Sequence, residues 1–248
     1  MKFVFDIDGT ICFDGKTIEP AIIDALQQIV AAKHEVIFAS ARPIRDLVPV
    51  LPSSFRENPL VGGNGCFISK EGHIEANYFE KVLLERLVSI IETYQLTFLA
   101  DGEWDYCFTG VTTHPIYKNI DQTSAKHCEL HELHKVCKLV LFEPTKEVIS
   151  ALSMLPVNVT AYKNENAIDI SPLGIDKVKG LQRLQVRDFI AFGNDNNDQC
   201  LFEHAIYSVC VGTNDVRKFA TKQISKEEVS QTIVNTLNNL EEILHVSS

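Results

Sequence analysis

Residues 3 to 10 read Phe-Val-Phe-Asp-Ile-Asp-Gly-Thr, and this stretch decides the fold. Its three leading apolar residues have β-favouring side chains and predict a buried strand that ends at Asp6. Asp8 follows two residues later, and Gly9 allows a tight turn. Two carboxylates this close in a buried loop need a cation or a shared proton. The segment predicts either a metal site that shields a nucleophilic Asp6 or a plain acidic turn.

The composition is typical of a globular protein. The 248 residues are 45% hydrophobic, enough for one large domain or two modest ones. No apolar run approaches the roughly 20 residues that span a membrane, and the net charge of −10 comes without a basic cluster. We therefore expect neither a membrane nor nucleic acid as a partner.

Seven cysteines are scattered along the chain without a Cys-x-x-Cys pair. An odd, dispersed set is typical of reduced thiols rather than of a disulfide framework. Met1-Lys2 leads straight into the first strand and leaves no room for a signal peptide. We therefore expect a cytoplasmic protein.

The first 70 residues alternate between strand and helix patterns. A helix opens at Pro20, a second buried strand covers Val36 to Ala39, and a third apolar segment begins at Leu60. Continuous apolar runs separated by helices are typical of a parallel sheet covered on both faces. Such sheets bind ligands at the carboxyl ends of their strands, which is where Asp6 and Ser40 lie.

The pattern changes between residues 78 and 171. A helix over 79–94 precedes short strands over 96–99 and 106–108, and a second set has strands over 136–142, 157–162 and 167–170 with a helix over 145–155. This predicts an inserted α+β domain, residues 78–171, within a doubly wound α/β core formed by residues 1–77 and 172–248. The core pattern resumes with strands over 189–192 and 208–211 and a C-terminal helix over 229–244.

Three further positions are candidates for chemistry. Ser40 and Arg42 follow the second strand and can bind phosphate oxygens, although a capping serine is equally compatible. Lys177 stands at a predicted helix start, where a cation suits nearby carboxylates better than the helix dipole, but it can also be a surface lysine. The run of polar residues from Gly193 to Asp198 is either a hard-cation site or a polar turn.

His127, Cys128, His131 and His134 form a zinc-like group without a second ligand pair of zinc spacing. We interpret the stretch as the solvated face of a polar helix.

These segments, in their order along the chain, resemble the haloacid dehalogenase superfamily and, more narrowly, its Cof-type sugar-phosphate phosphatases. The resemblance rests on the Asp6-x-Asp8-Gly9-Thr10 loop, Ser40 after a strand, Lys177, and the Gly193 loop. The insert matches the place and length of the family's cap domain, which implies a Rossmann-like core with a cap that closes over substrate. The resemblance covers the full chain.

The resemblance implies a division of roles for a Mg²⁺-dependent phosphatase. Asp6 would attack phosphorus to form an aspartyl phosphate, and Asp8 would protonate the leaving oxygen and later activate water, while Lys177 would hold the phosphoryl group. Substrate would be bound by Ser40, Ala41, Arg42 and Asn197. Mg²⁺ would be bound by Asp6, Asp8 through its main-chain carbonyl, Asn194 and Asp198. Asn197 and Asp198 would also orient Lys177 and the waters on the metal.

Two residues depart from the family's pattern. The family usually has Gly where Ala41 stands, a small change. It usually has Asp where Asn194 stands, and an amide oxygen can bind Mg²⁺ but removes one negative charge. We expect weaker metal binding, with Asn194 favoured over Asp195 as the ligand.

Other functions fit the sequence less well. A phosphomutase needs a second phosphate site, normally built from arginines, yet residues 78–171 contain one Arg, Arg86, and carry 8 basic against 13 acidic side chains. A non-catalytic phosphometabolite-binding protein is suggested only by Asn194. A receiver domain would lack the insert, and a P-type ATPase needs membrane helices. In the insert, Trp104, Asp105, Tyr106 and His114 either face the substrate or pack in the interior.

Overall fold

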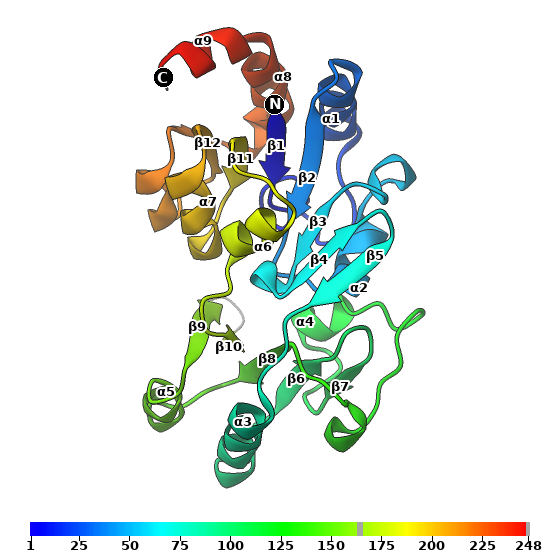
Figure 1. Ribbon diagram of the computed structural model, residues 1–248, viewed down its shortest axis with the longest axis vertical. Helices are drawn as coiled ribbons and strands as arrows, with labels where there is room; N and C mark the ends of the chain where they lie inside the picture. The colour runs from blue at the N-terminus through cyan, green and yellow to red at the C-terminus, as the bar shows by residue number, and fades with distance from the viewer. Residues whose placement is uncertain (163–165, 247–248) are drawn as a thin grey trace.

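The structure, a computed structural model, describes residues 1–162 and 166–246 and contains two β-sheets (Figure 1). The strands of the larger sheet are β1 (Lys2–Phe5), β2 (Glu35–Ala39), β3 (Leu60–Gly62), β4 (Phe67–Lys70), β5 (His73–Ala76), β11 (Phe189–Gly193), β12 (Tyr207–Val211) and β13 (Lys222–Ile224). Their order is β13-β12-β11-β1-β2-β3-β4-β5, with the strands from β13 to β3 parallel and the last two antiparallel.

Strand β1 lies in the middle of this sheet and sends alternate side chains to its two faces. Phe3 and Phe5 belong to one buried cluster, whereas Val4 belongs to the other. The first cluster is covered by α1 (Pro20–Ala31) and α8 (Val229–Asn238), and the second by α6 (Lys177–Arg183) and α7 (Gln199–His204). Helices on both faces of a parallel sheet confirm the predicted doubly wound core.

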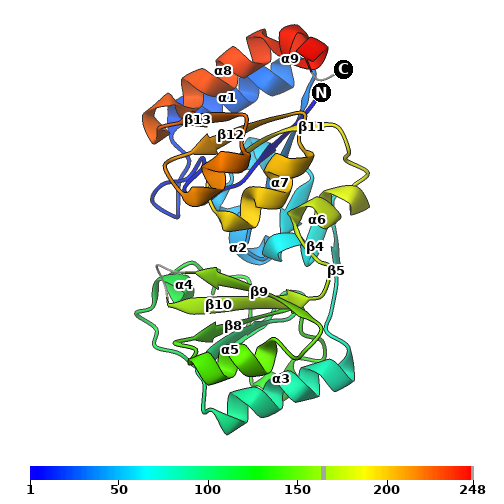
Figure 2. The same cartoon turned by 90° about the vertical axis from the view of Figure 1, so that its left-hand side faces the viewer.

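The smaller sheet lies beyond one end of the larger one (Figure 2). Its strands are β6 (Phe98–Asp101), β7 (Tyr106–Phe108), β8 (Lys138–Phe142), β9 (Val157–Tyr162) and β10 (Ala167–Pro172). They are antiparallel in the order β7-β6-β8-β10-β9. Helices α3 (Lys81–Thr93) and α5 (Lys146–Leu152) cover the face that points away from the core. The other face, called the open face below because no long helix covers it among the described residues, points toward the core and packs in part against Ile116 and Tyr117. The boundary residues 77/78 and 171/172 stay a prediction.

The remaining elements are short. They are α2 (Ile44–Leu47), α4 (Pro115–Lys118) and α9 (Leu240–Val246), with 3₁₀ turns η1 (Val48–Val50), η2 (Ser53–Phe55), η3 (Gly63–Gly65), η4 (Leu130–Glu132), η5 (Asn196–Asp198), η6 (Asp215–Phe219) and η7 (Lys226–Glu228). Within the described residues, none of the helices has the length and hydropathy needed to cross a membrane.

Two helix predictions were wrong in detail. The C-terminal helix is broken at Asn239, which leaves the helical conformation and separates α8 from α9. The stretch with His127, His131 and His134 is solvent-exposed as expected, but it is not an α-helix. The backbone groups of Lys126 and Cys128, the neighbours of His127, form hydrogen bonds with the backbone of Tyr106. The only helical turn in the stretch as described is a single 3₁₀ turn with a Glu129–Glu132 capping box.

Candidate active site

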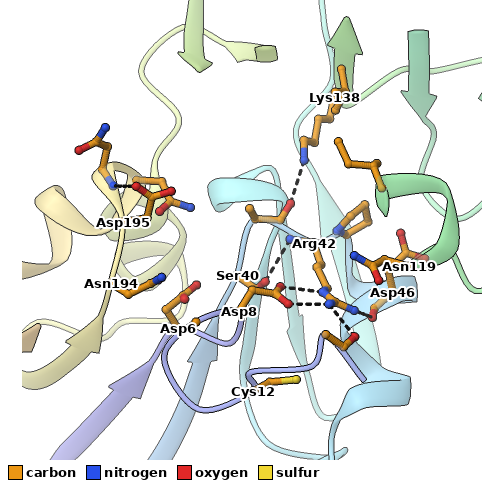
Figure 3. Close-up of a pocket in the computed structure, with 18 of the residues that line it drawn as sticks. Asp6, Asp8, Cys12, Ser40, Arg42, Asp46, Asn119, Lys138, Asn194 and Asp195 are labelled. Carbon is orange, nitrogen blue, oxygen red and sulfur yellow. Dashed lines mark hydrogen bonds and ion pairs between the residues drawn. The ribbon is translucent and has the colours of Figure 1, made fainter. Parts of the chain in front are cut away.

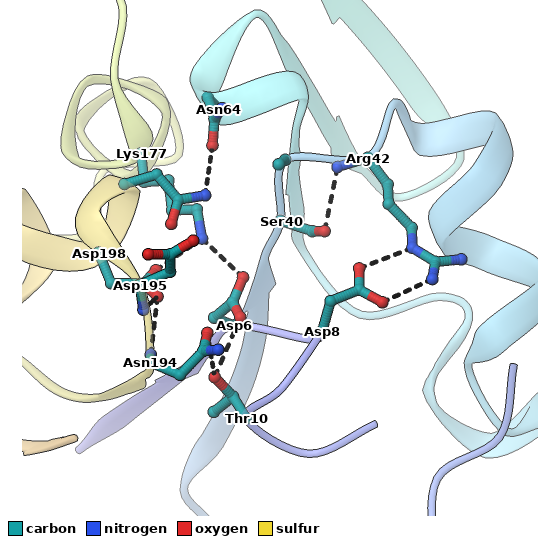
Figure 4. A network of polar contacts seen from close by, with 12 residues as sticks. Asp6, Asp8, Thr10, Ser40, Arg42, Asn64, Lys177, Asn194, Asp195 and Asp198 are labelled. Atoms are coloured by element: carbon teal, nitrogen blue, oxygen red, sulfur yellow. Dashed lines mark hydrogen bonds and ion pairs between the residues drawn. The ribbon is translucent and has the colours of Figure 1, made fainter. Parts of the chain in front are cut away.

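Asp6 lies at the carboxyl end of β1 and faces a buried lysine. The Lys177 Nζ is 2.6 Å from Asp6 Oδ1 and 2.6 Å from Asp198 Oδ1 (Figure 4). Lys177 is the first residue of α6, where the Asp176 side chain accepts a hydrogen bond from the Lys179 amide and caps the helix. The three charged groups are almost fully buried. The structure therefore brings together three segments that are separate in the sequence, namely the end of β1, the start of α6 and the Gly193 loop, as the Asp6 and Lys177 patterns predicted.

The protonation of Asp6 depends on this burial. Burial raises its pKa to about 7, the Asp198 carboxylate adds to the rise, and the Lys177 charge opposes it. The two neighbouring carboxylates in turn raise the pKa of Lys177 against the effect of burial, so the lysine stays protonated. A bound cation would act in the same direction as Lys177 and favour the ionised, nucleophilic form of Asp6.

Asp198 is held in place by its neighbours. Its Oδ1 accepts from Lys177, and its Oδ2 accepts the backbone amides of Asn194 at 2.9 Å and Asp195 at 3.1 Å. Both oxygens therefore have donors, and the carboxylate shapes the Gly193 loop while orienting the lysine. This geometry favours a positioning role, and direct metal ligation by Asp198 stays a prediction.

Oxygen donors suited to Mg²⁺ converge beside Asp6. The Thr10 hydroxyl lies 3.0 Å from Asp6 Oδ2 and 3.2 Å from Asn194 Oδ1, so it holds a carboxylate oxygen and an amide oxygen near one point (Figure 4). Among the described residues, no group of three or more His, Cys, Asp or Glu side chains is arranged to hold a metal. The donors present fit a Mg²⁺ ion with few protein ligands and several waters. Thr10 was not among the predicted site residues.

Asp8 points away from Asp6 and toward Arg42. Arg42 donates from Nε to Asp8 Oδ2 at 2.7 Å and from Nη2 to Asp8 Oδ1 at 2.6 Å, a bidentate pair. The pair lets the half-exposed Asp8 side chain reach the cavity in one fixed orientation. The backbone amide of Arg42 also donates to the Ser40 hydroxyl at 3.1 Å, which fixes the turn after β2. Arg42, predicted to bind substrate, is thus first of all the partner of Asp8.

The second sheet is tied to this turn by buried polar contacts. Arg45 donates to both oxygens of Asp46 at 2.7 Å and to Asp101 Oδ1 of β6 at 2.8 Å. Lys138 of β8 donates to the Ala41 carbonyl at 2.8 Å. Arg45, Asp46, Asp101 and Lys138 were not predicted from the sequence, because nothing in their local pattern indicates a partner in the other sheet.

Asn197 is linked to the second sheet through one intermediate residue. It donates to Asn64 Oδ1 at 3.0 Å, and Asn64 donates to Asp169 Oδ2 of β10 at 2.9 Å. Asn64 has a left-handed backbone conformation, with φ of 54°, in the glycine-rich turn after β3.

A cavity of about 620 Å³ lies between the two sheets (Figure 3). The core contributes the predicted residues Asp6, Asp8, Ser40, Ala41, Arg42, Asn194 and Asn197 to its lining. The second sheet and its loops contribute Leu99, Asp101, Ile116, Asn119, Ile120, Lys138, Val140 and Ala161. Trp104, Asp105, Tyr106 and His114 are absent from the described lining, and Tyr106 is buried in the second domain.

Comparison with known proteins identifies the family. A family model described as haloacid dehalogenase-like hydrolase matches residues 3–237. The 5-amino-6-(5-phospho-D-ribitylamino)uracil phosphatase YitU of Bacillus subtilis (strain 168) is 26% identical over 246 residues, which cover 90% of this chain and 91% of the relative. A phosphoglycolate phosphatase of Methanosarcina mazei is 24% identical over an alignment that covers 88% of this chain and 87% of the relative.

Solved structures share the fold along the full chain. The subclass IIB sugar phosphatase BT4131 superposes with a TM-score of 0.78 at 17% identity, covering 98% of this chain and 99% of its own. TM0651 from Thermotoga maritima superposes with a TM-score of 0.78 at 21% identity, covering 94% of this chain and 96% of its own. Because the family model extends over nearly the whole sequence, this chain belongs to the haloacid dehalogenase-like hydrolases.

Proposed function

We propose that this phosphatase hydrolyses small phosphorylated metabolites, sugar phosphates among them, with Mg²⁺ and through an aspartyl-phosphate intermediate. The observation that carries the proposal is the buried Asp6 carboxylate, 2.6 Å from the Lys177 ammonium and next to the Asn194 oxygen at the floor of the cavity. A carboxylate in such a place has a cation for the incoming phosphoryl group and oxygen donors for a metal. All seven cysteines are free, which supports a reducing compartment such as the cytoplasm.

The side chains divide the reaction between them. An Asp6 oxygen attacks phosphorus and the bond to the leaving oxygen breaks, while Asp8 gives that oxygen its proton. Asp8 then takes a proton from the water that attacks the phosphorus of the aspartyl phosphate and releases inorganic phosphate and free Asp6. Arg42 keeps Asp8 oriented in both steps. Mg²⁺, held by Asp6, Asn194 and the Asp8 carbonyl, would offset the charge of the phosphoryl group.

Lys177 and the Ser40 turn complete the phosphate site. Lys177 supplies a permanent positive charge, and Ser40, Ala41 and Arg42 line the cavity beside Asp8. Asn197 lines the same cavity and reaches the second sheet through Asn64. The open face of the second sheet closes the other side of the cavity, where it excludes water and selects the leaving group.

The test is hydrolysis of an aryl phosphate with and without Mg²⁺ by the wild type, Asp6→Asn and Asp24→Asn. Asp24 is exposed on α1 and serves as the matched control. We expect Mg²⁺-dependent turnover in the wild type and the control, and none with Asp6→Asn. Turnover that survives Asp6→Asn would contradict the assignment of the nucleophile.

The intermediate has its own test. Asp8→Asn keeps the nucleophile but lacks the group that protonates the leaving oxygen and later activates water. With 4-nitrophenyl phosphate, whose leaving group departs as the anion, the first step needs no proton, so the protein should retain a phosphoryl group after mixing. Intact-protein mass spectrometry should find the Asp8→Asn chain heavier by one HPO₃ unit. The additional Asp6→Asn change should remove that mass.

A further inference from the structure

Aliphatic side chains form part of the cavity wall opposite Asp6. Leu99 of β6 and Val140 of β8 are paired neighbours on the open face of the second sheet. Ile116 of α4 and Ile120 in the following turn continue this surface. These side chains face the space that a leaving group occupies once its phosphate is bound near Asp6.

The two cationic side chains among the described lining residues are already engaged. Arg42 pairs with Asp8 and also donates to the Gly15 carbonyl at 2.8 Å and the Asp46 carbonyl at 3.5 Å (Figure 3). Lys138 is 4% exposed, donates to the Ala41 carbonyl at 2.8 Å and forms an ion pair with Asp169 at 3.1 Å. Neither charge can bind a second anion on the leaving group without breaking a contact that holds Asp8 or the Ser40 turn.

Four aspartates line the cavity in addition to Asp6 and Asp8. Asp46 and Asp101 share Arg45, and Asp101 Oδ2 has no hydrogen-bond partner within the described part of the chain. Asp195 and Asp215 are exposed at the rim. A second anion on the substrate would therefore lose its hydration among apolar and acidic side chains without gaining a cation.

We propose that the enzyme selects phosphomonoesters whose leaving group carries no negative charge and has one apolar side, and that it rejects esters with a carboxylate or a second phosphate. This inference rests on the proposed function, since it takes the cavity as the substrate site. The volume of about 620 Å³ lies within the roughly 300–1,000 Å³ of sites that enclose drug-sized ligands. A leaving group larger than a two-carbon acid fits it, so a polyol or a neutral ring attached to a polyol suits the site better than glycolate.

The experiment compares two esters that differ in one group. D-glucitol 6-phosphate has a CH₂OH group where 6-phospho-D-gluconate has a carboxylate. Their dissociation constants are measured calorimetrically with the full-length Asp6→Asn variant and Mg²⁺, so no turnover is needed. We expect the carboxylate to bind roughly tenfold more weakly, or worse. Equal binding, tighter binding of the carboxylate, or binding of neither ester overturns the inference.

A charge added to the wall tests the cause of the selectivity. Ala161 lines the cavity and is exposed, so Ala161→Arg can be introduced without disturbing the core, and Ala161→Gln is the uncharged control. Combined with Asp6→Asn, Ala161→Arg should reduce the preference for glucitol 6-phosphate about twofold to fivefold, and the control should not. An unchanged preference in Ala161→Arg contradicts the electrostatic cause. Aryl phosphate hydrolysis by the wild type remains the separate test of the phosphatase itself.

Discussion

Replacing Lys177 with methionine removes the one charge that Asp6 and Asp198 share. Methionine keeps most of the side-chain length but cannot donate to the two carboxylates, each 2.6 Å from Nζ in the wild type. Both carboxylates lie in the interior, where an unpaired charge is strongly unfavourable. We expect loss of catalysis and a large loss of stability.

The size of the stability loss follows from the burial. Breaking a buried ion pair by removing one partner costs about 3–5 kcal/mol. Asp6 can relieve part of this loss by taking up a proton, since burial already raises its pKa to about 7. At pH 8 we therefore expect the free energy of unfolding to fall by about 4 kcal/mol.

The loss should depend on pH in a defined direction. Lys177 lowers the pKa of Asp6, so its removal raises that pKa further above the unfolded value. A raised pKa in the folded state contributes stability that is fully present below the unfolded pKa and is lost as the pH rises through the folded pKa. Around pH 8 the wild-type Asp6 is ionised while the variant still holds a proton, so the deficit grows by up to about 1.4 kcal/mol per pH unit.

Urea denaturation in EDTA at pH 6 and pH 8 measures both effects. The matched control is Lys179→Met, an exposed lysine on the same helix, which should change the free energy of unfolding by about 0.5 kcal/mol or less. Lys177→Met combined with Asp198→Asn should recover part of the stability, because one buried charge is gone. The ion-pair reasoning is refuted if Lys177→Met and Lys179→Met are equally stable, or if the deficit of Lys177→Met is the same at both pH values.

Three further outcomes follow from the site. Asn194→Asp adds a carboxylate beside Asp6 and should lower the Mg²⁺ dissociation constant, measured by calorimetry, roughly tenfold. Asp195→Asn should leave that constant unchanged, and the reverse pattern would assign the ligand to Asp195. The affinity of the wild type for Mg²⁺ should fall about tenfold per pH unit below pH 7, because the proton held by Asp6 at its raised pKa must leave before the metal binds. A Mg²⁺ affinity that does not depend on pH would argue against Asp6 as a ligand. Arg45→Met leaves the buried carboxylates of Asp46 and Asp101 without the arginine they share, and should lower the free energy of unfolding in urea by about 3–5 kcal/mol. A decrease below about 1 kcal/mol would show that this contact between the sheets contributes little to stability.

Much of the candidate site was predictable because each part has a local signal. An apolar strand followed by Asp6, a strand followed by Ser40 and a strand followed by the Gly193 loop are patterns of a few residues. The parallel order of these strands then places their carboxyl ends at one edge. Lys177 follows the same logic, since its position at a helix start was the signal that it serves the carboxylates.

The contacts between the sheets had no such signal. Arg45 and Asp101 are 56 positions apart, and Lys138 and Ala41 are 97 apart. A charged side chain looks the same in the sequence whether it faces solvent or a buried partner, so the pairing is invisible before the chain folds.

The sequence by itself determined the doubly wound core and predicted the insert and the loop that carries Asp6, because hydrophobic periodicity and short turns are local properties. Only the tertiary structure decided which charges are free to act. It paired Arg42 with Asp8, engaged Lys138 at the Ser40 turn and placed aliphatic and acidic side chains in the cavity wall opposite Asp6. The physical reason is burial: once two distant segments exclude water, each charge must find its partner, and the remaining surface sets what the cavity accepts.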